Sequence, residues 1–227
     1  SSASDWSNID VIKADPTDPN KLWVGSNVGL LPFDHETKEF GPTPEGLPDS
    51  PANVKDLDIV EQDGQVYMLT AIGTRIYRSL DAGESFEVLT SPVFPGFSVN
   101  SPTGTFPGTV ELTISRNDPN YMYLSVSQPN GFLRGVYATT DAGTTWYVIA
   151  PPSFDGENIS QFAPFFNGLT SQGWYDNMIT SVPNEENEEV IMGGIRMWRW
   201  NLSGITPGIT AWEEVNANFA SFPGGPP

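Results

Sequence analysis

Five acidic residues share a setting that could support chemistry. Each lies in or beside a short run of alternating apolar and polar residues, and they are Asp10, Asp56, Asp58, Glu111 and Asp176. Two carboxyl groups that flank a sugar bond can hydrolyse it when they are about 5–5.5 Å or about 6.5–9.5 Å apart. Clustered carboxylate oxygens can instead hold a cation such as Ca²⁺. The third alternative is solvated side chains in a chain with excess acid. The sequence leaves all three open and assigns no catalytic residue.

Cysteine and histidine contribute little to the chemistry of this chain. It contains no cysteine and one histidine. The absence of cysteine removes thiol nucleophiles, disulfides and Cys-based metal or iron–sulfur sites. His35 lies in the polar turn of residues 33–38, where a histidine is expected to be solvated. The sequence therefore argues against a histidine-dependent triad and against a His-rich zinc site.

The segment 151–176 combines aromatic and polar side chains. Aromatic faces beside polar groups are suited to binding sugar rings or a protein partner. The predicted ligand contacts in this segment are Phe162, Phe165, Phe166, Trp174, Tyr175 and Asp176. The alternative is that these aromatic rings fold back over a neighbouring sheet and fill its core.

Four similar apolar runs indicate the elements that must position these residues. The runs are centred on Trp23, Tyr67, Tyr123 and Ile191, with separations of 44, 56 and 68 residues. Each follows a turn rich in Asp, Asn, Pro or Gly, and another alternating run precedes each turn. Further short strands follow the central runs. Four short strands per repeated unit predict an all-β fold, a β-propeller of four-stranded antiparallel blades.

The repeat also predicts how the chain is divided. One propeller domain, or a fragment of one, is expected over residues 1–227. The first strand of each blade should line a central channel, which would place the acidic residues there. The predicted blades cover about 5–43, 53–90, 109–150 and 174–216, and the predicted inserted loops are 91–108 and 151–173.

Two turns have nearly the same sequence. Residues 79–86 and 139–146 both read Ser/Thr-x-Asp-x-Gly-x-Ser/Thr-aromatic and begin 60 residues apart. In a tight hairpin the Asp carboxylate can accept backbone N–H bonds, Gly can supply a positive φ, and the aromatic ring can tuck beneath the turn. The residues predicted to build these turns are Ser79, Asp81, Gly83, Phe86, Thr139, Asp141, Gly143 and Trp146.

This pattern resembles the Asp-box, also called the bacterial neuraminidase repeat. Proteins with Asp-box propellers include sialidases, xyloglucan-hydrolysing enzymes, sortilin-like receptors and a photosystem assembly factor. Residues 22–34 look instead like a sensor-type propeller repeat, and residues 173–176 resemble a blade-opening segment of secreted bacterial members. The resemblance implies that box aspartates lie away from the active centre. It also implies six or more blades, so that four blades form an open arc completed by missing blades or a further protein chain.

The fold alone does not choose among these functions. A sialidase resemblance would require three convergent arginines and an Arg-Ile-Pro-like segment before the first box, and none of the six arginines lies in such a segment. We therefore expect a non-catalytic binding module without a required cofactor. The alternative is part of a sialidase- or xyloglucanase-like glycoside hydrolase, with its catalytic carboxylates completed by missing blades.

Composition and charge limit the partners of this chain. Asp and Glu number 28 against 10 Lys and Arg, which gives a net charge of −18. No basic stripe is present to bind a nucleic-acid backbone, and no apolar run of about 18 residues predicts membrane insertion. An aromatic content of 12% argues against disorder. The expected location is extracellular or at a bacterial cell surface, with a glycan or a further protein chain as partner.

Overall fold

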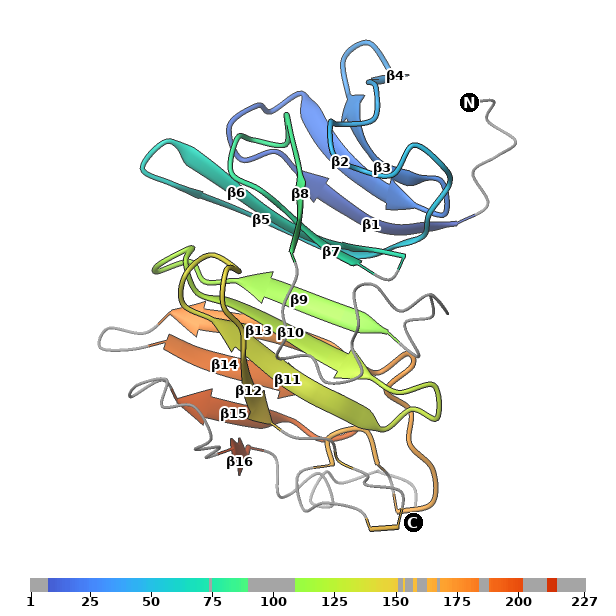
Figure 1. The fold of residues 1–227 in the computed structure, drawn as a ribbon, viewed down its shortest axis with the longest axis vertical. Coiled ribbons are helices and arrows are strands. Elements are labelled where there is room, and N and C mark those ends of the chain that lie inside the picture. Colours follow the sequence, from blue (N-terminus) through green and yellow to red (C-terminus); the bar gives the residue numbers. More distant parts are fainter. Residues whose placement is uncertain are drawn as a thin grey trace, which may run out of the picture.

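A computed structural model describes most of the chain (Figure 1). The described residues are 8–73, 75–89, 109–150, 153, 157–158, 163–166, 168–183, 188–201 and 212–215. Over these ranges the regular secondary structure is entirely β. None of the described residues forms a helix that is long and apolar enough to cross a membrane.

The described strands form four antiparallel sheets, and each sheet is one blade. The first blade consists of β1 (Ile9–Ala14), β2 (Lys21–Ser26), β3 (Gly29–Asp34) and β4 (Glu39–Phe40). The second consists of β5 (Val54–Gln62), β6 (Gln65–Ile72), β7 (Arg75–Ser79) and β8 (Glu87–Leu89). In each blade the strands neighbour one another in chain order.

The third and fourth blades repeat this arrangement. The third consists of β9 (Val110–Ile114), β10 (Met122–Ser127), β11 (Leu133–Thr139) and β12 (Tyr147–Ala150). The fourth consists of β13 (Met178–Pro183), β14 (Glu188–Gly193), β15 (Trp198–Asn201) and β16 (Trp212–Glu214). The predicted fold class is confirmed, because the chain forms four four-stranded antiparallel blades of a partial β-propeller.

The blades pack face to face because successive side chains of a strand point to opposite faces. Met68 and Leu69 are adjacent in β6, yet Met68 packs in the core between blades one and two and Leu69 in the core between blades two and three. Met122 and Tyr123 of β10 divide in the same way between the cores on either side of blade three. Strands buried on both faces therefore read as nearly continuous apolar runs.

The first strands of the blades lie side by side. β1 contacts β5, β5 contacts β9, and β9 contacts β13. Figure 1 shows the same succession from the upper to the lower part of the molecule. The first strands of successive blades are neighbours, as expected if they are the innermost strands. Side chains of consecutive blades can therefore meet along this row of inner strands.

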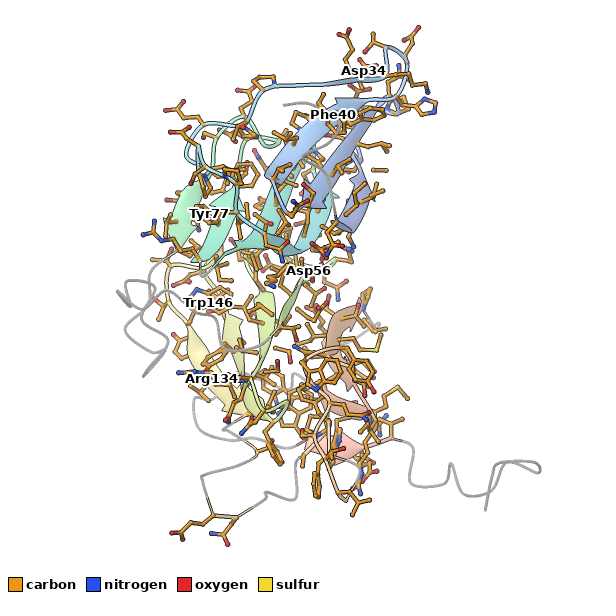
Figure 2. The ribbon with its side chains drawn as sticks, turned by 90° about the vertical axis from the view of Figure 1, so that its right-hand side faces the viewer. Asp34, Phe40, Asp56, Tyr77, Arg134 and Trp146 are labelled. Carbon is orange, nitrogen blue, oxygen red and sulfur yellow. The ribbon has the colours of Figure 1, made fainter. Side chains whose placement is uncertain are left out.

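Blade one carries an apolar outer face that packs against no other described blade. Its register aligns Ile12 with Val24 and Leu31, and Leu22 with Phe33 and then Phe40. Ile12 is 56% exposed and Phe40 is 46% exposed. Figure 2 shows Phe40 at the end of the molecule far from the third and fourth blades.

Candidate functional site

Three of the five acidic residues come together where blades two and three meet. Asp56 and Asp58 are two residues apart in β5 and so lie on one face of the strand, and Glu111 approaches from β9. A β-bulge between Val54 and Asp56 precedes them in the pairing of β5 with β6. Figure 2 shows Asp56 at this boundary. Asp10 is exposed on β1 and Asp176 lies just before β13, so neither belongs to a single cluster of five.

Asp56 and Asp58 connect blade two to the backbone of blade three. Asp56 Oδ2 accepts a hydrogen bond from the Leu112 N–H at 2.9 Å, and Asp58 Oδ2 accepts one from the Ile114 N–H at 2.9 Å. Since β9 is an edge strand of its sheet, these N–H groups have no strand partner on that side. The two carboxylates satisfy the edge of β9 in place of another strand.

Glu111 and Asp56 form a carboxyl pair that holds a proton. Burial, the negative charge of Asp56 and a hydrogen bond to Asp56 raise the pKa of Glu111 to about 8, while Lys13 acts in the opposite direction. Burial also raises the pKa of Asp56, despite the N–H bonds from Leu112 and Leu57. Two carboxyl groups in contact cannot both ionise easily. At pH 7 Glu111 is therefore protonated and donates to Asp56.

Two basic side chains that the sequence analysis did not identify complete the cluster. Arg116 Nη2 donates to Asp58 Oδ1 at 2.9 Å, and Lys13 Nζ lies 4.0 Å from the same oxygen. Lys13 lies on the inner strand of blade one, and Arg116 lies two residues after the inner strand of blade three. Their position on or directly after inner strands was the available signal, because consecutive inner strands contact one another.

The geometry of the carboxyl cluster limits what it can do. Glu111 and Asp56 are in hydrogen-bond contact, which is closer than the separation of about 5 Å or more that a glycosidase pair requires. Among the described residues, no group of three or more His, Cys, Asp or Glu side chains is placed to hold a metal ion. The principal contacts of Asp56 and Asp58 are backbone N–H groups and cations of adjacent blades.

The two repeated turns contain the same hydrogen bonds. Ser79 Oγ donates to Asp81 Oδ1 at 2.7 Å and accepts from the Gly83 N–H at 2.9 Å, and Asp81 Oδ1 accepts from the Ser85 N–H at 3.0 Å. In the second turn, the Asp141 carboxylate accepts from Thr139 Oγ1 at 2.7 Å and from the Thr145 N–H at 2.7 Å. Each aspartate thus closes the hairpin between the third and fourth strands of its blade.

Two successive residues in each turn have positive φ. The values are 58° at Ala82 and 82° at Gly83, and 54° at Ala142 and 91° at Gly143. The sequence predicted a positive φ at the glycines but gave no signal for the alanines, which adopt this left-handed region less readily. The strained alanine is therefore a feature of the turn that only the structure reveals.

The glycines of both turns face the preceding blade. A Cβ at Gly83 would collide with the ring of Trp23 in blade one, and a Cβ at Gly143 would lie 2.7 Å from Leu89 Cδ1 in blade two. The aromatic residue of each turn enters the same interface: Phe86 contacts Trp23 edge to face, and Trp146 is buried between blades two and three. Each turn closes its own hairpin and also packs on the blade before it.

The aspartates of these turns differ from Glu111 in their titration. Burial acts to raise the pKa of Asp81, but hydrogen bonds from Ser85 and Ser79 outweigh it and hold the pKa below its ordinary value. Burial likewise acts to raise the pKa of Asp141, and bonds from Thr145 and Thr139 hold it below the ordinary value. Both turns therefore favour the ionised carboxylate.

The aromatic residues predicted as ligand contacts separate into two groups. Phe165 is 1% exposed in the core between blades three and four, so its assignment as a surface contact is corrected. Phe166 stacks on Phe132 with ring centroids 5.7 Å apart. Trp174 and Tyr175 are 55% and 56% exposed.

Trp174 and Tyr175 form an aromatic pair on the surface beside β13. Their ring centroids are 4.3 Å apart with an interplanar angle of 62°. Asp176 follows them and is half-buried. Phe162 lies outside the described residues. Of the tryptophans that the structure describes, Trp174 is the one that is more than half exposed.

Another buried carboxyl group lies between blades three and four. Glu188 is 7% exposed, and burial raises its pKa despite hydrogen bonds from Ser115 and Ser181. Its Oε1 atom and the hydroxyl of the fully buried Tyr123 have no hydrogen-bond partner within the described part of the chain. Sequence reasoning missed Glu188 because it lies in an acidic run that reads as a solvated turn.

Comparison with known proteins identifies the fold. Neither the protein-family models nor the curated proteins include a match to this chain. Among solved structures, an ancestral GH74 enzyme is similar over 94% of this chain, with 15% identity and a TM-score of 0.58. The match covers 26% of that enzyme, so the chain spans about a quarter of its length.

Two further structures have lower TM-scores. YCF48 from Cyanidioschyzon merolae has 16% identity and a TM-score of 0.46, with 91% of this chain and 55% of that chain covered. The GH74 enzyme of Niastella koreensis has 12% identity and a TM-score of 0.43, with 91% and 37% covered. At 15% identity, the likeness to the ancestral enzyme shows the β-propeller fold alone.

Proposed function

We propose that this chain is part of a secreted or cell-surface Asp-box propeller that acts as a non-catalytic binding module for a glycan. The observation that carries the proposal is the exposed pair of Trp174 and Tyr175. The match of both turns to the Asp-box sequence pattern supports the family assignment. Further blades, from a longer chain or another protein, would complete the propeller.

The aromatic pair suits a sugar ligand for a physical reason. Large aromatic rings gain free energy when they leave water, and the four largest fully buried side chains of the described residues, Trp23, Trp146, Tyr123 and Phe165, do so here without any ligand. Trp174 and Tyr175 instead keep more than half of their surface in water. A sugar ring can cover an aromatic face while Asp176 accepts hydrogen bonds from its hydroxyl groups.

The second candidate function is part of a glycoside hydrolase. The observation that favours it is the pKa of Glu111, which is raised to about 8, because a carboxyl group that stays protonated at neutral pH can act as a general acid. The hydrogen bond between Glu111 and Asp56 weighs against this role, since no sugar bond fits between two carboxyl groups in contact.

Binding of soluble xyloglucan in a native affinity gel tests the proposal. Trp174→Ala and Tyr175→Ala should each weaken retention by about tenfold, as expected when one aromatic contact of about 1.4 kcal/mol is lost. Phe40→Ala is the matched control, because it removes another exposed aromatic ring from the opposite end of the chain. This control should bind like the unmodified chain.

Three results would count against the proposal. Absence of xyloglucan retention would remove this glycan as the ligand, and equal retention by all variants would remove Trp174 and Tyr175 as its contacts. Release of reducing sugar from xyloglucan, or turnover of an aryl sialoside, would favour the hydrolase candidate.

A further inference from the structure

Blades two and three are joined by a group of contacts around the turn of Asp141. Arg78 of β7 donates through Nη1 to the carbonyl of Ala142 and pairs with Glu87 on the neighbouring strand, with Nε 2.8 Å from Oε1. Gly143 packs on Leu89, which is 6% exposed. In this arrangement a cation of one blade binds the alanine carbonyl of the next blade's turn, and the turn glycine packs on an apolar side chain of the first blade. We call this arrangement the box joint.

Blades one and two are connected by a second box joint built from different strands. Lys21 Nζ of blade one lies 3.4 Å from the carbonyl of Ala82, which occupies the same place in its turn as Ala142. Gly83 packs on Trp23, two residues after Lys21. In each of the two turns, a cation of the preceding blade thus contacts the alanine carbonyl, and an apolar side chain of that blade packs on the glycine.

Blades three and four are joined in another way. Ala138 of blade three corresponds in sequence to Arg78 of blade two, because each directly precedes the Ser or Thr that begins its turn. No Asp-box pattern follows β15 in the sequence of blade four. Trp212 Nε1 instead donates to the carbonyl of Ile149 at 3.0 Å. The blade before a boxless blade therefore has no cation at this position.

Three side chains on the outer face of blade four correspond to Arg78, Glu87 and Leu89 of blade two. Arg199 pairs in register with Glu213, and its Nη2 atom lies 2.8 Å from Glu213 Oε2, as Arg78 pairs with Glu87. Val215 follows Glu213 by two residues, as Leu89 follows Glu87.

Exposure separates the two sets of side chains. The side chain of Arg78 is 12% exposed and that of Arg199 is 43% exposed. Leu89 is 6% exposed and Val215 is 44% exposed. The set in blade two is covered by the turn of blade three, whereas the set in blade four has no turn on it among the described residues.

We infer that the outer face of blade four is the receiving half of a box joint and binds a further blade with an Asp-box turn. The carbonyl of the residue before the box glycine would accept from Arg199, and that glycine would pack on Val215. A second copy of this chain does not fit, because its two boxes are already seated on Lys21 and Arg78. The inference rests on the proposed Asp-box propeller and is independent of the ligand.

The first experiment compares Arg78→Met with Arg199→Met in the 227-residue chain. Both substitutions remove an arginine that pairs with a glutamate on the next strand, and Arg199 also lies 4.0 Å from Glu189. Arg78→Met should lower Tm by about 3–8 °C because it also breaks the joint. Arg199→Met should lower it by about 1 °C or less. Equal shifts would overturn the inference.

The second experiment supplies the missing half of the joint. The chain is extended at its C-terminus by a second copy of its residues 109–150, which contain an Asp-box turn. Arg199→Met should now lower Tm of the extended chain by an amount similar to that of Arg78→Met. The control extension carries the box aspartate replaced by Ala, and there Arg199→Met should have a smaller effect.

The outcomes of the extension experiment are distinct. No effect of Arg199→Met in the extended chain, whether or not the added copy folds, would overturn the inference. Light scattering of the unextended chain detects self-association, and a dimer that Arg199→Met dissociates would assign the face to a second copy. Loss of xyloglucan retention with intact joints would refute only the proposed ligand.

Discussion

The aspartates of the two repeated turns, Asp81 and Asp141, and Glu111 on the inner strand β9 carry the same chemical group in opposite states. Asp81 and Asp141 accept hydrogen bonds from hydroxyl and N–H groups at exposed turns, and their pKa values lie below the ordinary value. Glu111 is buried against Asp56, and its pKa rises to about 8. The immediate donors, rather than the net charge of −18, decide which group is ionised.

This difference reflects two ways of joining blades. At the periphery, an ionised aspartate fixes the shape of a turn, and the turn then packs on the preceding blade. At the inner strands, Asp56 and Asp58 reach directly across to N–H groups of β9. Glu111 keeps its proton because it is buried and because a further negative charge there would be repelled by Asp56.

The largest expected effect is that of removing a box aspartate. Asp141→Ala and Asp81→Ala should each lower the free energy of unfolding by about 1–3 kcal/mol. The reason is that hydroxyl and N–H groups of the turn lose the carboxylate that accepts their hydrogen bonds. Urea unfolding of each variant measures this change. Asp49→Ala is the control, since Asp49 is exposed outside any box turn, and it should change stability by less than about 0.5 kcal/mol.

Ligand binding should be unchanged in both box variants. A variant that kept its full stability but lost xyloglucan retention would contradict the structural role assigned to the box. Such a result would make the box turns part of the binding site and would remove their contrast with the inner carboxyl groups.

The sequence predicted the blades but not the contacts between them. Alternation within each run shows which residues share a face, and the repeat shows that four units are alike. It does not give the relative register of β5 and β9, which brings Glu111 to Asp56. For the same reason, the approach of Lys13 and Arg116 to Asp58 was not predicted.

The aromatic segment shows a related limit. Phe165 and Trp174 lie within ten residues of one another in sequences of similar character. Phe165 is buried because residues 163–166 pack on blades three and four, whereas Trp174 remains 55% exposed. Whether an aromatic ring in a loop fills a core or faces water depends on where the loop packs. No periodic pattern in the loop carries that information.

A smaller effect is expected from replacing Glu111 by a residue that cannot ionise. The folded chain keeps the Glu111 proton up to about pH 8, whereas an unfolded chain loses it near the ordinary value of 4.5. The free energy of unfolding should therefore fall as pH rises from about 4.5 to 8. Glu111→Gln stays neutral, can donate to Asp56, and should gain stability relative to the unmodified chain as pH rises from 5 to 8.

Thermal unfolding at pH 5 and pH 8 measures this gain. Glu84→Gln is the matched control, because it makes the same replacement at a glutamate that is exposed in the first of the two repeated turns. If Glu111→Gln and Glu84→Gln showed the same pH dependence, Glu111 would not be protonated in the folded chain at neutral pH.

The smallest effect is expected at acid pH and has the opposite sign. Because the folded chain holds the pKa of Asp141 below its ordinary value of 3.8, the ionised carboxylate stabilises the fold above that value. This contribution is lost as pH falls through the lower pKa of the folded state. The exposed position of Asp141 keeps this contribution small, since solvent screens the charge.

Urea unfolding between pH 5 and pH 2.5 measures this contribution. Asp141→Asn should lose less stability than the unmodified chain as pH falls over this range. Glu111→Gln should run parallel to the unmodified chain below pH 4, because Glu111 is already protonated in both states there. Suppose instead that Glu111→Gln reduced the loss of unfolding free energy between pH 5 and pH 2.5 and Asp141→Asn did not. The assignment of a charge to Asp141 and of a proton to Glu111 would then be reversed.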